Sequence, residues 1–192
     1  MRIGLGSFLR VGLALVLAVV LQLSTFSQMP ILGGQFDIVV LVVAAVAYYA
    51  GAIPGCAVGF AAGFLLDLLS GATMGASSLV LTAVGYGIGR FREVRDPSHG
   101  LLPLAVGAVA TGAWVLAFAA VSFMLDVGAT VSPLVLRDML VTVLLNTLLA
   151  LPIFIGCRKL LRPVLAVDPL ARSARRRPPR DTGPIGLRGL EI

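Results

Sequence analysis

Six blocks of apolar residues, separated by short polar or glycine-rich joints, fill most of the chain. They cover about residues 8–26, 36–50, 54–69, 77–89, 101–125 and 134–157. A helix needs roughly 20 mainly apolar residues to cross a hydrocarbon core about 30 Å thick. Only 12% of all residues are charged, against roughly 25% in soluble domains. We therefore expect an all-α integral membrane protein with about six short transmembrane helices.

The second to fourth blocks are crowded. They share only residues 36–90, which three spans of about 17 residues would nearly exhaust. We expect short helices and tight turns there, although one crossing plus a re-entrant segment is an alternative. The first block follows Arg2 and Arg10 and resembles a signal peptide, but no small-residue cleavage site follows it. We interpret it as a retained first helix.

The basic residues predict the orientation. Cytoplasmic loops of membrane proteins carry the excess of arginine and lysine. If the N-terminus is cytoplasmic and the six blocks alternate, 14 of the 15 basic residues lie on the cytoplasmic side and only Arg137 lies outside. An odd number of crossings would separate the N-terminal from the C-terminal arginines. We therefore predict a multi-pass protein with an even number of spans and both termini in the cytoplasm.

The composition divides the chain into a transmembrane domain, residues 1–162, and a cytoplasmic tail, residues 163–192. The tail contains the run Arg-Ser-Ala-Arg-Arg-Arg-Pro-Pro-Arg at 172–180 and few apolar residues. Such a composition predicts disorder. Each arginine near an anionic membrane surface is worth about 1 kcal/mol, so we expect the tail to bind anionic lipid. Its tether to the membrane argues against nucleic acid.

No pattern in the sequence predicts catalysis, a metal or a cofactor. Cys56 and Cys157 lie in separate apolar blocks without a CxxC spacing, and His99 is the only histidine. The acidic residues are scattered over different loops, whereas metal-dependent headgroup transferases and intramembrane proteases need clustered or paired side chains. We expect no enzyme, and the absence of charge rings or filter-like repeats argues against a channel.

Glycines repeat every four residues in the third block, at Gly55, Gly59 and Gly63, and Asp67 continues the same row. Small residues at this spacing let two membrane helices approach closely. The partner is a helix of this chain, a helix of another protein, or a second copy in a homodimer. Asp67 is costly at the edge of a span. It either hydrogen-bonds the following turn, which contains Gly75, or offers a polar contact to a partner helix or small ligand.

Three further residues are candidates for structural or partner-binding roles. Tyr86 and Arg90 end the fourth block at the predicted interface, where such side chains are common. Asn146 lies mid-way along the sixth block, where its amide needs partners. Arg137 precedes Asp138 at the exterior start of that block, and the two form either an interfacial ion pair or a contact with an exterior partner.

Together these features resemble the rod shape-determining protein MreD family over about residues 8–162. The residues that carry the resemblance are Phe36-Asp37-Ile38-Val39, Gly59-Phe60, Gly63-Phe64-Leu65-Leu66-Asp67, Gly71, Gly75, Gly85-Tyr86, Leu136-Arg137-Asp138, Leu144-Leu145-Asn146 and Pro152. The resemblance implies the bacterial inner membrane, no catalytic residues, and a fold similar to the S-components of energy-coupling-factor transporters. It also implies work with an MreC-like partner, an MreB-like filament and wall synthases. The tail is not part of the resemblance.

The resulting hypothesis is a non-catalytic scaffold subunit of the cell-wall elongation complex. In it, Gly59, Gly63, Asp67 and Gly75 shape a groove for an MreC-like helix, while Arg137 and Asn146 hold the last span in place. The alternative is a small-molecule-binding, S-component-like transporter subunit. That alternative requires an exterior pocket with several polar or aromatic groups, in which the predicted exterior loops are poor.

Overall fold

The computed structural model describes residues 5–26, 33–71, 74–94, 102–124 and 133–165. This part of the chain is built from helices, as the sequence predicts. The elements are α1 (Leu5–Leu21), the π-helical turn η1 (Gln22–Phe26), α2 (Ile38–Ala50), α3 (Ala52–Ser70), α4 (Ala76–Val94), α5 (Leu102–Met124) and α6 (Pro133–Leu165).

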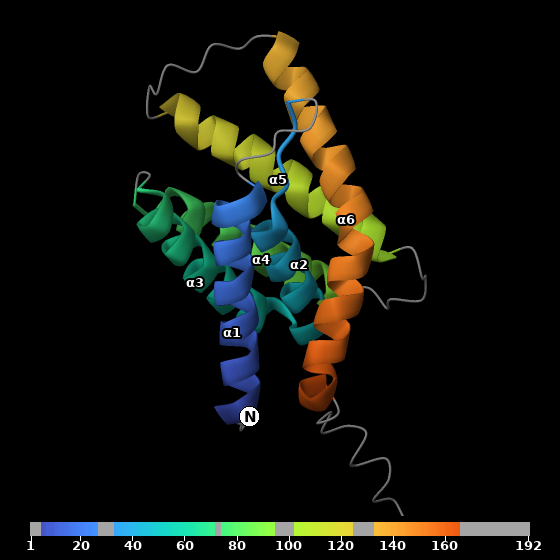
Figure 1. Ribbon diagram of the computed structural model, residues 1–192. Coiled ribbons are helices and arrows are strands. Elements are labelled where there is room, and N and C mark those ends of the chain that lie inside the picture. The colour runs from blue at the N-terminus through green and yellow to red at the C-terminus, as the bar shows by residue number, and fades with distance from the viewer. Residues whose placement is uncertain (1–4, 27–32, 72–73, 95–101, 125–132, 166–192) are drawn as a thin grey trace, which may run out of the picture.

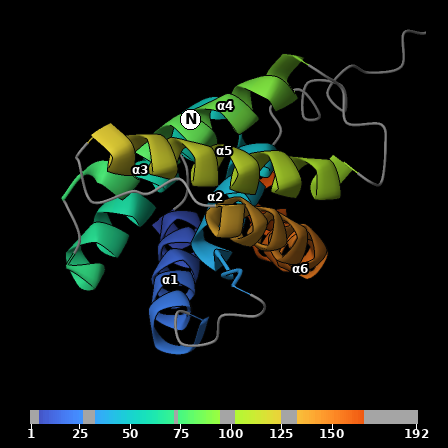
Figure 2. The same ribbon diagram turned by 90° about the horizontal axis from the view of Figure 1, so that it is seen from above.

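Helix α2 lies at the centre of the molecule and contacts all five other α-helices. Its sequence Ile-Val-Val-Leu-Val-Val-Ala-Ala-Val-Ala is apolar on every side, a pattern that requires burial on every side. Every residue from Val39 to Tyr48 is accordingly buried. Figure 2 shows α1 and α6 on one side of α2, and α4 and α5 on the other. This central helix is the core of the fold.

Among the described residues, three helices are long and apolar enough to cross a membrane: Ala52–Ser70, Leu102–Val121 and Leu134–Leu161. By length and composition they agree with the predicted membrane protein. The apolar parts of α1 and α2, Arg10–Ser24 and Ile38–Ala50, are shorter. At 1.5 Å per residue, α2 covers only about 20 Å. The predicted count of six crossings therefore stays a prediction, although the start of α1 and the end of α6 lie at the same end of the molecule (Figure 1).

The connection before α2 explains its shortness. The second apolar block begins at Phe36, but the helix begins only at Ile38. Residues 35–37 are not helical, and they lie beside α6, where Gln35 and Asp37 are bonded to Thr142 and Asn146. Backbone that is not helical is tolerated at membrane depth only where protein or water satisfies its polar groups. Side chains of other helices must therefore replace the missing turn of α2.

Helix α6 extends further than the sixth apolar block. It runs on to Leu165 through Pro163, so the first three residues of the predicted tail are helical. The remaining tail, 166–192, lies outside the described residues. At 33 residues the helix is about 50 Å long, which exceeds a hydrocarbon core of about 30 Å.

Candidate functional site

The repeated glycines of α3 face α4. A β-carbon at Gly59 would overlap the carbonyl of Leu81, and one at Gly63 would overlap the backbone of Ser78. A β-carbon at Gly55 would come 2.7 Å from the carbonyl oxygen of Gly85. The two helix backbones are thus in direct contact along the whole pair. We call this contact the glycine seam. The helix that packs against the row of glycines is therefore α4 of the same chain.

Asp67 closes the seam at the end where α3 passes into α4. The residue is 1% exposed, and its carboxylate accepts three backbone N–H groups at the start of α4. The Oδ2 atom lies 2.8 Å from the nitrogen of Gly75 and 3.4 Å from that of Ser78, and Oδ1 lies 3.3 Å from that of Ser77. A helix start carries unpaired N–H groups and a partial positive charge. Asp67 therefore caps α4 across the turn.

Gly75 makes this cap possible. Its φ is +97°, a left-handed conformation that side chains with a β-carbon rarely adopt. Gly71, which ends α3, is also left-handed, with a φ of +66°. The turn between the helices therefore depends on two glycines, and one of them donates directly to the Asp67 carboxylate.

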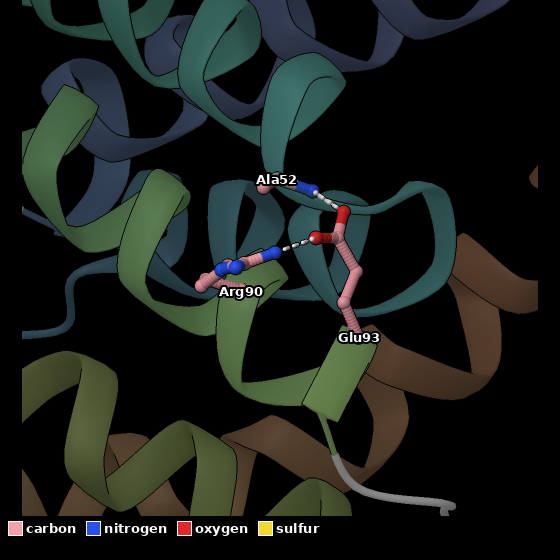
Figure 3. A network of polar contacts seen from close by, with 3 residues as sticks. All are labelled: Ala52, Arg90 and Glu93. Carbon is pink, nitrogen blue, oxygen red and sulfur yellow. Dashed lines mark hydrogen bonds and ion pairs between the residues drawn. The ribbon is translucent and has the colours of Figure 1, made fainter.

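A second carboxylate closes the seam at its other end. Glu93, near the end of α4, accepts the N–H of Ala52, the first residue of α3, at 3.0 Å (Figure 3). Its other oxygen pairs with Arg90 at 3.2 Å. The N–H of Ala52 and, second, the Arg90 hydrogen bond lower the pKa of the Glu93 carboxyl below its ordinary value. Each helix of the pair thus supplies the acid that caps the other.

The neighbouring Arg92 acts on the preceding helix. Its guanidinium donates to the carbonyl of Tyr49, in the last turn of α2, at 2.7 Å. A cation suits the negative end of a helix dipole, as an anion suits the positive end. Arg92 and Glu93 therefore hold both sides of the corner at Gly51, whose φ is +100°.

A second polar group lies deeper in the molecule, and we call it the buried amide cluster. Asn146, fully buried on α6, accepts the N–H of Asp37 at 3.0 Å and donates to the carbonyl of Gln35 at 3.4 Å. Thr142 accepts the N–H of Gln35 at 3.1 Å. Gln22, the first residue of the π-turn, donates to the Asp37 carboxylate at 3.2 Å and accepts the N–H of Val39 at 2.8 Å. The cluster ties η1 and the start of α2 to α6.

A family model for the rod shape-determining protein MreD matches residues 3–164. The chain belongs to the MreD family. No curated protein and no solved structure matches it. Membership confirms the resemblance seen in the sequence and makes this a membrane protein that determines rod shape.

In this MreD-family chain, five of the seven predicted site residues fall into two groups. Gly59, Gly63, Asp67 and Gly75 build the inside of the α3–α4 pair, while Asn146 belongs to the buried amide cluster. The two remaining candidates point outward. Tyr86 is 51% exposed on α4, and Arg137 on α6 lies 3.5 Å from the Asp138 carboxylate.

Sequence reasoning missed Glu93, Gln22 and Thr142. Glu93 lies among the arginines that predict the orientation. Because this segment was considered only for its positive charge, the role of Glu93 as a cap was missed. Gln22 is a polar residue inside the first apolar block, and that interruption was a usable signal. Thr142 precedes Asn146 by four residues, which places both on one face of α6. Thr142 could therefore have been predicted as a polar neighbour of Asn146.

Proposed function

We propose that this MreD-family chain is a non-catalytic scaffold subunit of the cell-wall elongation complex in the bacterial inner membrane. It would cross the membrane six times with both termini in the cytoplasm, in an arrangement similar to transporter S-components. Its task would be to hold a membrane helix of an MreC-like partner, and through that partner to reach wall synthases. An MreB-like filament would meet its cytoplasmic side.

The observation that carries this proposal is the construction of the α3–α4 pair. Its inner contact is backbone against backbone, and a carboxylate caps the start of each helix. Such a pair is a rigid unit, and it presents exposed aromatic side chains on its outward faces. Phe60, Phe64 and Tyr86 are 57%, 46% and 51% exposed, and the rings of Phe60 and Phe64 stack with centroids 6.4 Å apart.

Helices associate in lipid through close van der Waals packing on preorganised surfaces. We place the MreC-like helix against these outward faces. Gly59, Gly63, Asp67 and Gly75 would then contribute indirectly, by fixing the geometry of α3 against α4. Asn146 would do the same for α6 through the buried amide cluster, and Arg137 would contact the exterior part of the partner.

Co-purification from native membranes in mild detergent tests the proposal. A variant with Phe60→Ala and Phe64→Ala should lose most of the MreC-like partner, and so should Tyr86→Ala. Phe123→Ala is the matched control, because Phe123 is 67% exposed on α5 and its loss removes the same ring elsewhere. The control should retain the partner.

Undiminished recovery with both outward-face variants, at normal expression, would place the partner elsewhere. Recovery of a transporter ATPase module in place of an MreC-like protein would favour the S-component alternative. A retained second copy of the chain would instead assign these faces to a homodimer.

A further inference from the structure

Two arginines from distant parts of the sequence converge on Tyr49, in the last turn of α2. Arg92 of α4 is fixed there, because its guanidinium donates to the Tyr49 carbonyl at 2.7 Å. On the other side, the Tyr49 ring packs against Phe154 of α6, with centroids 6.1 Å apart. Arg158 follows Phe154 by four residues, so it lies one turn further along the same face of α6.

The positive charges of both arginines act on the phenol of Tyr49. Glu93 also feels the charge of Arg92, but its carboxylate oxygens are bonded to Ala52 and Arg90. Within the described residues, neither the Tyr49 hydroxyl nor the Arg158 guanidinium has a hydrogen-bond or ion-pair partner. Two cations near a neutral donor favour an anion.

The surroundings favour a lipid over a soluble anion. The start of α1 and the end of α6 lie at the same end of the molecule (Figure 1), and Arg158 and Lys159 belong to the last turns of α6. Exposed apolar side chains continue from Arg158 along the same face of α6. Ile155 and Leu151 are 55% and 37% exposed, and they follow the three- and four-residue spacing of one helix face.

We propose that Tyr49, Arg92 and Arg158 bind the phosphate of an anionic phospholipid, whose acyl chains lie along α6. A guanidinium matches a phosphate with two parallel hydrogen bonds, and the phenol supplies a third donor. The site belongs to the folded part of the chain and is distinct from general attraction by the tail. It does not depend on the proposed scaffold role.

Titration of the full-length protein with phosphatidylglycerol in neutral detergent, followed by native mass spectrometry, tests the site. The wild type should bind one phosphatidylglycerol at least about tenfold more tightly than phosphatidylcholine, as a charge-assisted contact requires. Arg158→Gln should remove most of that preference, and Tyr49→Phe should weaken binding about threefold. Arg158→Lys keeps the charge but loses the two parallel hydrogen bonds of the guanidinium, so its preference for phosphatidylglycerol should lie between those of the wild type and Arg158→Gln.

Two controls remove the same charge elsewhere. Lys159→Gln changes the next residue, which projects roughly 100° further round α6, and Arg176→Gln changes the tail. Both should alter the affinity by no more than about twofold, because a more distant charge is screened. Equal losses in Arg158→Gln and Lys159→Gln would overturn the site in favour of non-specific attraction. Displacement of the lipid by millimolar inorganic phosphate would overturn the lipid assignment.

Discussion

Gly85 and Gly87 lie two residues apart on α4 and have opposite surroundings. A β-carbon at Gly85 would overlap the backbone of Gly55, whereas one at Gly87 would meet nothing within 4 Å. Gly85→Ala should therefore destabilise the fold by about 1–3 kcal/mol through overpacking. Gly87→Ala should be neutral or stabilising by up to about 1 kcal/mol, because alanine favours a helix.

Thermal unfolding in detergent measures the difference between these two variants. In a chain of this size, each kcal/mol shifts Tm by about 2–4 °C. Equal Tm values for Gly85→Ala and Gly87→Ala would mean that the glycine seam is not closely packed.

Glu93 gives the fold a predictable dependence on pH. Its pKa lies below the ordinary value of 4.5, first because its carboxylate accepts the Ala52 N–H and second because it pairs with Arg90. The carboxylate therefore contributes its full stabilisation above about pH 4.5 and loses it as the pH falls through the lowered pKa. The Tm gap between wild type and Glu93→Gln should accordingly shrink on acidification.

Arg90→Gln is the companion variant for Glu93. It removes the smaller cause and leaves the Ala52 hydrogen bond, so most of the pH dependence should survive. A Tm gap that stays constant from neutral to acidic pH would show that Glu93 does not cap α3 in solution.

At the scale of elements, the buried amide cluster determines where α2 begins. Asn146→Leu would leave the N–H of Asp37 and the carbonyl of Gln35 without partners, at about 1–3 kcal/mol each. Thr147→Val is the matched control, because the one bond of the Thr147 hydroxyl within the described residues goes to the carbonyl of Val143 in its own helix. Asn146→Leu should lower the Tm by several degrees more than Thr147→Val; similar shifts would dismiss the cluster as a support of α2.

The element that the sequence predicted best is the α3–α4 pair. Four-residue glycine spacing indicated a close helix contact. For Asp67 on the same row, a hydrogen bond to the following turn was one of two alternatives, the other being a polar contact to a partner. The partner of the glycines stayed open, because periodicity describes one face of a helix and not what lies opposite. Phe36 and Asp37, at the start of the second apolar block, were not foreseen as non-helical, since an apolar block looks the same whether helical or extended. The contacts with Thr142 and Asn146, more than 100 residues away, favour the non-helical backbone, and periodicity does not show such contacts.

The arrangement of the whole molecule rests on the path of this pair through the membrane. Met74, between α3 and α4, and Val94, at the end of α4, are 64% and 73% exposed. If the chain crosses six times, Met74 faces the exterior and Val94 the cytoplasm. A re-entrant pair would instead keep Met74 away from the exterior solution.

Cysteine labelling in spheroplasts separates these two paths. In a background with Cys56→Ala and Cys157→Ala, a membrane-impermeant maleimide should label Met74→Cys in intact spheroplasts. It should label Val94→Cys only after permeabilisation. Labelling of Val94→Cys from outside would invert the orientation, and failure at Met74→Cys alone would leave α3 and α4 as a re-entrant pair. In that second case the arginines at both ends of the chain would still share the cytoplasm, because a re-entrant pair replaces two crossings and keeps their number even.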